Sequence, residues 1–196
     1  YQASAQIEAI SLVRKLRRVQ VYGRDSERRA RFAAAMSKQL GIEVVPVEQP
    51  QDAARGASIL VTVTSSKTPV LQGVWIEPGT HINAAGSNAL DRIELDAEAV
   101  RRAALVVADS REQAKVECGD LVEPIKEGVL DWEQVRELGE IVVGRVPGRP
   151  SPEAITLFES QGLAMLDVAV GARLFALARA EGVGRDVTVP GGRTHD

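Results

Sequence analysis

The sequence lacks several features that mark whole classes of protein. It has one cysteine, Cys118, among 196 residues, so no disulfide can form within the chain. No apolar run reaches the ~18 residues of a membrane-spanning helix, and no basic segment followed by an apolar stretch opens the chain. The formal net charge is −3, which gives no support to an electrostatic nucleic-acid binder. We therefore expect a cytoplasmic protein that binds neither nucleic acid nor membrane.

The sequence also lacks the side-chain spacings of hydrolytic and metal sites. We find no metal-ligand spacing, no set of Ser, His and Asp, and no Cys and His pair, and we predict no bound metal. Hydrophobic residues make up 44% of the chain and charged residues 26%, which suits one globular domain or slightly more.

Short apolar runs alternate with amphipathic stretches along most of the chain. This alternation is typical of βαβ units and a parallel sheet. The runs are rich in Val and Ile with little polar alternation, as expected where helices cover both faces of the sheet. The predicted strands are residues 19–22, 42–47, 59–63, 81–85, 105–108 and 155–158. The predicted helices are the opening segment and residues 27–40, 94–103, 110–118 and 163–180. We therefore predict an α/β fold with a Rossmann-like doubly wound parallel sheet.

The chain opens on a helix, whereas a doubly wound nucleotide-binding fold opens on a strand and a Gly-rich turn. The first glycine is Gly23, so that turn would lie before residue 1. Either the chain has another fold, or its first strand and Gly-rich loop lie upstream, and we favour the second interpretation. We expect residues 1–150 to be an incomplete dinucleotide-binding domain. Residues 151–196 would be a C-terminal strand, helix and tail.

The turn after residues 19–22 is where such folds distinguish NAD from NADP. An acid there binds the ribose hydroxyls, but this chain has Gly23 followed by Arg24. Arg24 can bind a phosphate through two parallel hydrogen bonds, and Ser26 can add a hydroxyl donor. The turn favours NADP over NAD. In the alternative interpretation Asp25 or Ser26 is simply the N-cap of a solvated helix.

Two further loops follow predicted strands at the edge of the sheet where ligands of open α/β sheets bind. Their hydroxyls and backbone amides suit a cofactor's ribose or nicotinamide, although the first could also be an ordinary polar loop. His81 begins its strand at the opposite edge, so we assign it a structural role. The candidate cofactor-binding residues are Arg24, Asp25 and Ser26 in the turn after residues 19–22, Thr62, Thr64 and Ser65 in the first loop and Ala85, Gly86, Ser87 and Asn88 in the second.

Three segments, in order, are similar to motifs of one known family. They are the run from Val74 to Asn88 (VWIEPGTHINAAGSN), the run from Ala108 to Ala114 (ADSREQA) and the run from Phe158 to Asp167 (FESQGLAMLD). On these motifs the chain, from Tyr1 to about Gly184, resembles the ornithine cyclodeaminase and mu-crystallin family. Three ordered motifs are more specific than any one of them.

The resemblance implies a homodimer with a Rossmann-like NAD(P)-binding half and a second half that supplies substrate-binding Lys and Arg residues. Most of that second half would be absent from this chain. The resemblance also implies that the final helix packs toward the absent half, which forms the dimer interface.

Members of this family move a hydride between the nicotinamide ring and an amino acid or its imine. The cyclodeaminases carry a catalytic acid where this sequence has Asn88, a departure that favours an NADP-linked ketimine reductase or amino-acid dehydrogenase. On this resemblance Asn88 and Ser160 are the catalytic candidates, Asn88 orienting substrate and nicotinamide and Ser160 lying near the ring. The alternatives are a true ornithine cyclodeaminase, a protein that binds NADP and a small ligand without turnover, and a fragment that is inactive alone.

Overall fold

The computed structural model describes residues 2–185 and 187. They fall into two compact units, which divide between Gly162 and Leu163. No helix within the described residues is long and apolar enough to cross a lipid bilayer.

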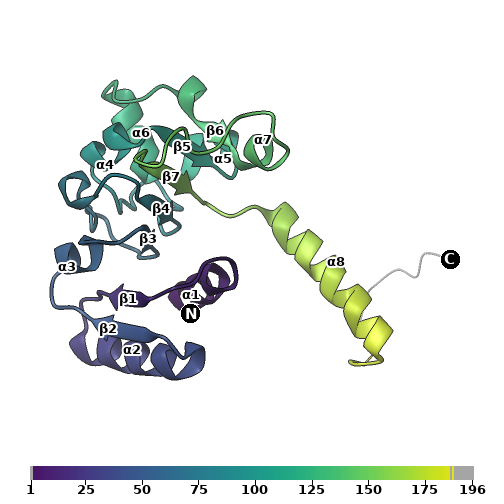
Figure 1. The fold of residues 1–196 in the computed structure, drawn as a ribbon. Coiled ribbons are helices and arrows are strands. Elements are labelled where there is room, and N and C mark those ends of the chain that lie inside the picture. Colours follow the sequence, from purple (N-terminus) through teal and green to yellow (C-terminus); the bar gives the residue numbers. More distant parts are fainter. Residues whose placement is uncertain (1, 186, 188–196) are drawn as a thin grey trace. The chain divides into compact units, whose positions relative to one another are not determined.

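The first unit contains a small sheet of two parallel strands, β1 (Arg18–Val21) and β2 (Glu43–Pro46). Around it lie the helices α1 (Gln2–Val13), α2 (Ser26–Leu40) and α3 (Pro50–Ala54). A small apolar cluster is buried here by side chains of α2 and β2, with apolar residues of α1 and β1 packed against it, whereas Ala54 of α3 belongs to the core of the larger sheet. This sheet lies with α1 and α2 at the lower left of Figure 1.

A second sheet of five parallel strands forms the rest of the first unit. Its strand order is β3 (Ile59–Thr62), β4 (His81–Ala84), β7 (Thr156–Glu159), β5 (Leu105–Ala108) and β6 (Arg136–Glu137). The strand β7, which the sequence analysis placed in a C-terminal segment, thus lies at the centre of this sheet between β4 and β5.

The parallel α/β fold predicted from the sequence is confirmed, and its sheet is divided in two. In a doubly wound fold of strand order 3-2-1-4-5-6, β2, β1, β3 and β4 correspond to positions 3, 2, 4 and 5. The division between β1 and β3 therefore falls at position 1.

One face of the five-stranded sheet holds the main core. Side chains such as Leu60, Ile82 and Leu157 on this face are buried. They pack in one cluster with Val100 and Leu121 from the covering helices. The covering elements are α4 (Ala97–Arg102), α5 (Arg111–Glu117) and α6 (Gly119–Lys126), with the short 3-10 helices η1 (Gly73–Trp75) and η2 (Trp132–Gln134).

The opposite face of this sheet is less completely covered. Ile59, Leu105 and Phe158 are only half-buried, and they line a cavity of about 490 Å³ together with Arg149 and part of α7 (Leu138–Val142). The cavity lies over the sheet face and includes the first residues of the strands. It is therefore distinct from the edge at which the strands end.

The second unit contains the helix α8 (Ala164–Glu181), which ends at Gly182 in a left-handed conformation. Asp167 lies in its first turn, where the helix dipole favours a negative charge. Apolar residues lie all round the helix, as its sequence AMLDVAVGARLFALARAE indicates. A helix that is apolar on every side is typical of one that is buried in a larger structure.

Candidate functional site

All five strands of the larger sheet end at the same level, β6 through the pairing of Glu137 with Ala108. Thr62 of β3 pairs with Ala84 of β4, which pairs with Glu159 of β7, and Glu159 pairs with Ala108 of β5. Because these strands are parallel, the loops that follow them emerge together at one edge of the sheet. The structure therefore brings together the two predicted loops and the segment that contains Ser160, as their sequence positions implied.

Glu94, a residue that the sequence analysis did not single out, joins the two loops. Its side chain is fully buried. Its Oε1 accepts a hydrogen bond from the backbone nitrogen of Thr64 at 2.5 Å, and its Oε2 accepts one from that of Gly86 at 2.9 Å. One carboxylate thus holds the loop after β3 against the loop after β4.

Gly86 is needed at this point because the protein itself fills the space beside it. A Cβ atom there would lie 2.7 Å from Cδ of Glu94 and closer still to the carbonyl oxygen of Thr64. Gly86 is a cofactor-binding candidate from the sequence. The structure shows that Thr64 and Glu94 approach it closely.

Asp120, at the start of α6, holds the backbone of Glu94 in place. Its Oδ1 accepts hydrogen bonds from the backbone nitrogens of Glu94 and Leu95 at 2.6 and 3.0 Å. Its own backbone nitrogen donates to the hydroxyl of Ser87, which in turn donates to the carbonyl of Arg92. Burial raises the pKa of Asp120 to about 7, against the opposing effect of these backbone hydrogen bonds. Ser87 is therefore a buried residue of the second loop, and its hydroxyl is hydrogen-bonded within the protein.

A second acid, Glu159, lies at the end of β7 beneath the same edge. It is fully buried, and its Oε2 accepts a weak hydrogen bond from Sγ of Cys118 at 3.5 Å. Burial raises the pKa of Glu159 well above its ordinary value, and the nearby charge of Asp120 acts in the same direction. Burial also raises the pKa of the Cys118 thiol, so this cysteine is poorly suited to nucleophilic chemistry.

Asp109 fixes the segment that contains Ser160. Its Oδ2 accepts hydrogen bonds from the hydroxyl of Ser160 at 3.1 Å and from the backbone nitrogen of Gly162 at 2.8 Å. Its Oδ1 accepts one from the backbone nitrogen of Ser110. The end of β5 thereby orients the hydroxyl that follows β7, immediately before the chain leaves the first unit.

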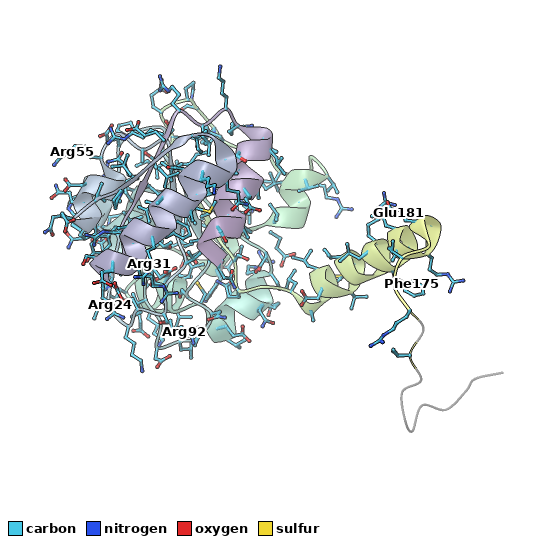
Figure 2. The ribbon with its side chains drawn as sticks, turned by 90° about the horizontal axis from the view of Figure 1, so that it is seen from below. Arg24, Arg31, Arg55, Arg92, Phe175 and Glu181 are labelled. Carbon is cyan, nitrogen blue, oxygen red and sulfur yellow. The ribbon has the colours of Figure 1, made fainter. Side chains whose placement is uncertain are left out.

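The remaining loop candidates differ in their surroundings. Thr62 is buried, and its hydroxyl has no hydrogen-bond partner among the described residues. Ser65 is exposed. Ala85 donates its backbone hydrogen to the carbonyl of Thr62. The side-chain oxygen of Asn88 accepts a hydrogen bond from Arg92, which is labelled in Figure 2.

The turn from Gly23 to Ser26 follows the end of β1, in the smaller sheet. Arg24 is exposed at the surface of the first unit (Figure 2). Asp25 is the N-cap of α2, and its carboxylate accepts from the backbone nitrogen of Arg28 at 2.9 Å. The capping role that the sequence analysis left open therefore belongs to Asp25, and Ser26 is the first residue of the helix.

Arg29, which the sequence analysis also missed, stabilises this turn. It is buried, and its guanidinium donates to the carbonyl of Gly23 and to Glu48, each at 2.7 Å. Arg24, Arg28 and Arg29 lie close together in the sequence, and no sequence pattern indicates that Arg29 is the buried one of the three.

His81 lies in the protein framework at the start of β4, as expected. Its ring nitrogens contact the hydroxyl of Thr156 at 2.7 Å and Oδ1 of Asn83 at 3.0 Å, and Arg149 donates to the same hydroxyl. Burial lowers the pKa of His81. Within residues 2–185 and 187, no group of three or more His, Cys, Asp or Glu side chains is arranged to hold a metal ion.

The comparisons with known proteins agree with this architecture. The model of the ornithine cyclodeaminase/mu-crystallin family matches residues 1–180. The chain is 38% identical over 187 residues to a Delta(1)-pyrroline-2-carboxylate reductase of Bacillus cereus, a match that covers 95% of this chain and 57% of that protein.

Two solved structures resemble the chain closely. The Delta(1)-pyrroline-2-carboxylate reductase of Thermococcus litoralis, in complex with NADH and L-proline, matches with a TM-score of 0.91 and 41% identity over 95% of this chain and 58% of that one. An archaeal alanine dehydrogenase dimer with bound NAD matches with a TM-score of 0.87 and 35% identity over 95% of this chain and 57% of that one. The chain spans somewhat more than half the length of these relatives, and it belongs to the ornithine cyclodeaminase/mu-crystallin family.

Proposed function

We propose that this chain is the nicotinamide-dinucleotide-binding part of a reductase of cyclic imines or a dehydrogenase of amino acids. The observation that carries the proposal is the edge at which β3, β4, β5 and β7 end together, with the loops after β3 and β4 joined by Glu94. Ligands of open α/β sheets bind at this edge. The related reductase from Thermococcus litoralis was solved with NADH and L-proline, which supports both the cofactor and the substrate class.

The residues present at this edge suit a dinucleotide. The exposed hydroxyl of Ser65 lies in the first loop, where a ribose or a carboxamide would need hydrogen-bond partners. At the end of β1, Arg24 is exposed and Gly23 stands in place of an acid. This favours the 2′-phosphate of NADP over the free ribose of NAD.

The roles of the protein's own groups follow from their contacts. Asp109 holds the hydroxyl of Ser160 in one orientation, so Ser160 can offer its oxygen as an acceptor to a ligand at the edge. Asn88 exposes an amide that orients substrate by hydrogen bonds but cannot take up a proton as a carboxylate does. A nicotinamide dinucleotide bound at this edge would supply or accept the hydride. Asn88 in place of an acid favours reduction or dehydrogenation over cyclodeamination.

We also infer what completes the sheet and what the partner of the chain is. A strand from a segment outside this sequence would lie between β1 and β3 and join the two sheets. A second half would supply substrate-binding Lys and Arg side chains and the interface of a homodimer. The archaeal alanine dehydrogenase dimer supports a homodimer. Location in the cytoplasm stays a prediction.

The proposal is tested by turnover in the complete gene product. Purified protein is mixed with NADPH or NADH and with cyclic imines that carry a carboxylate, and oxidation of the cofactor is followed by its absorbance. The reverse reaction is measured with amino acids and the oxidised cofactors. We expect imine-dependent oxidation that is faster with NADPH.

Each alternative function has its own outcome in this experiment. Binding of the cofactor without turnover of any imine or amino acid would indicate a binding protein. Release of ammonia from ornithine without net reduction of the cofactor would indicate a cyclodeaminase. Either result would contradict the proposed reductase or dehydrogenase.

A further inference from the structure

Glu94 makes contacts that its position in the sequence does not explain. Its two carboxylate oxygens accept backbone hydrogen bonds from Thr64, 30 residues earlier, and from Gly86, 8 residues earlier. We propose that Glu94 is a positioning residue that sets the spacing of the loops after β3 and β4 and thereby the affinity for the dinucleotide. This inference rests on the proposed function.

Glu94 acts through the loops because its side chain is fully buried. Its backbone is fixed independently, since its nitrogen donates to Oδ1 of Asp120 at 2.6 Å. The loops also cannot approach each other more closely, because the space beside Gly86 is filled by Thr64 and by Glu94 itself. The carboxylate therefore holds both loops at one separation.

A carboxylate suits this position better than any other side chain of its size. Both of its oxygens accept hydrogen bonds, and two backbone N–H groups point at them. In Glu94→Gln one oxygen is replaced by an amide nitrogen, which carries only donors and would face one of these N–H groups. That substitution keeps the volume and removes one of the two connections.

Asp96 provides a matched control two residues along the chain. Its Oδ1 also accepts hydrogen bonds from two backbone nitrogens, those of Gly73 at 2.8 Å and Ala99 at 2.9 Å. These contacts connect η1 with the start of α4 and leave both loops untouched. Asp96→Ala therefore removes two comparable hydrogen bonds without releasing the edge of the sheet.

The experiment measures the Kd of NADPH and of NADH for the complete gene product by nicotinamide fluorescence. The wild type is compared with Glu94→Gln, Glu94→Ala and Asp96→Ala, and the thermal unfolding midpoint of each protein is recorded. We expect Glu94→Gln to raise both Kd values by the same factor, roughly tenfold or more, because both cofactors use these loops. Asp96→Ala should lower the midpoint and change either Kd by less than about twofold.

Three results would overturn the inference. The first is an unchanged Kd in folded Glu94→Gln, which decides the matter even where Glu94→Ala does not fold. The second is an equal rise in Kd in Asp96→Ala, which would mean that general loss of stability lowers affinity. The third is a wild type that binds neither cofactor, which would overturn the proposed function as well, whereas the first two leave that function standing.

Discussion

Arg24 and Asp25 are neighbours in the turn after β1, but their side chains have different surroundings. Asp25 accepts a hydrogen bond within its own helix, from the backbone nitrogen of Arg28. Arg24 is exposed, and no hydrogen bond or ion pair within the described residues occupies its guanidinium. Of the two, only Arg24 has a charged group that remains available to a ligand.

Replacement of this arginine tests the cofactor preference. Arg24→Ala should weaken NADPH binding by roughly tenfold or more and leave NADH binding nearly unchanged, because a charge-assisted bond to a phosphate contributes about 1.5–3 kcal/mol. The Kd of each cofactor, measured by fluorescence titration, gives the answer. Arg55, exposed beyond the end of α3, supplies the control Arg55→Ala. An equal loss for NADH and NADPH would contradict the preference for NADP.

The buried Asp120 makes the stability of the protein depend on pH. Its pKa rises from 3.8 to about 7 in the folded protein because it is buried. Between these values the folded state binds more protons than the unfolded state, so stability falls as the pH rises through this range. Asp120→Asn removes the titrating group and keeps an oxygen for the two backbone donors.

We expect the stability of Asp120→Asn relative to the wild type to increase from pH 5 to pH 7, by at most about 1.4 kcal/mol per pH unit. Thermal unfolding midpoints of the complete proteins, measured across this range, provide the comparison. Because the charge of Asp120 helps to raise the pKa of Glu159, the difference between the two profiles reports the coupled pair of acids. Parallel pH profiles would show that Asp120 does not titrate there.

At the scale of elements, the short apolar runs located most strands correctly. The run at residues 105–108 coincides with β5, and the other predicted strands agree with the structure within one or two residues. Val- and Ile-rich runs between turn residues are strong local signals for buried parallel strands. The strand β6 was missed because it is only two residues long and both residues, Arg136 and Glu137, are charged.

The helix predicted over residues 94–103 begins only at Ala97. Glu94 and Leu95 looked like its first turn, but both are buried outside it and Asp96 is the N-cap. The helix α6, which contains Pro124, was missed because proline inside a helix is unfavourable. Both errors fall in the network that supports the candidate site, where contacts between distant residues outweigh local preference.

The N-cap of α2 gives a prediction for a single element. Asp25→Ala removes the side-chain acceptor for the nitrogen of Arg28, so it should lower the free energy of unfolding by about 1 kcal/mol. Asp25→Ser keeps a capping oxygen and should restore most of that loss. Denaturation curves of the two variants are the measurement. Equal stability of Asp25→Ala and the wild type would refute the capping role.

At the scale of the whole molecule, a further strand between β1 and β3 would explain why the sheet is divided. The strands β1 and β3 each have one edge that pairs with no other described strand. In the complete gene product a strand between them would protect their amide hydrogens, and this chain alone should exchange them faster. Hydrogen exchange of the two proteins, compared for residues 18–21 and 59–62, tests this. Equal protection would contradict a strand at that place.

The apolar surface of α8 also indicates that this helix is covered in the complete protein. Its sequence carries no polar side, so the helix needs cover from another part of the protein or from a second copy. The sequence alone could locate this helix but could not define its partner.

The central claim is that the edge formed by β3, β4, β5 and β7 binds a nicotinamide dinucleotide. Its most direct test is titration of the complete gene product with NADPH and NADH, followed by nicotinamide fluorescence. We expect saturable binding of both cofactors, with the lower Kd for NADPH. A folded protein that binds neither cofactor would contradict it.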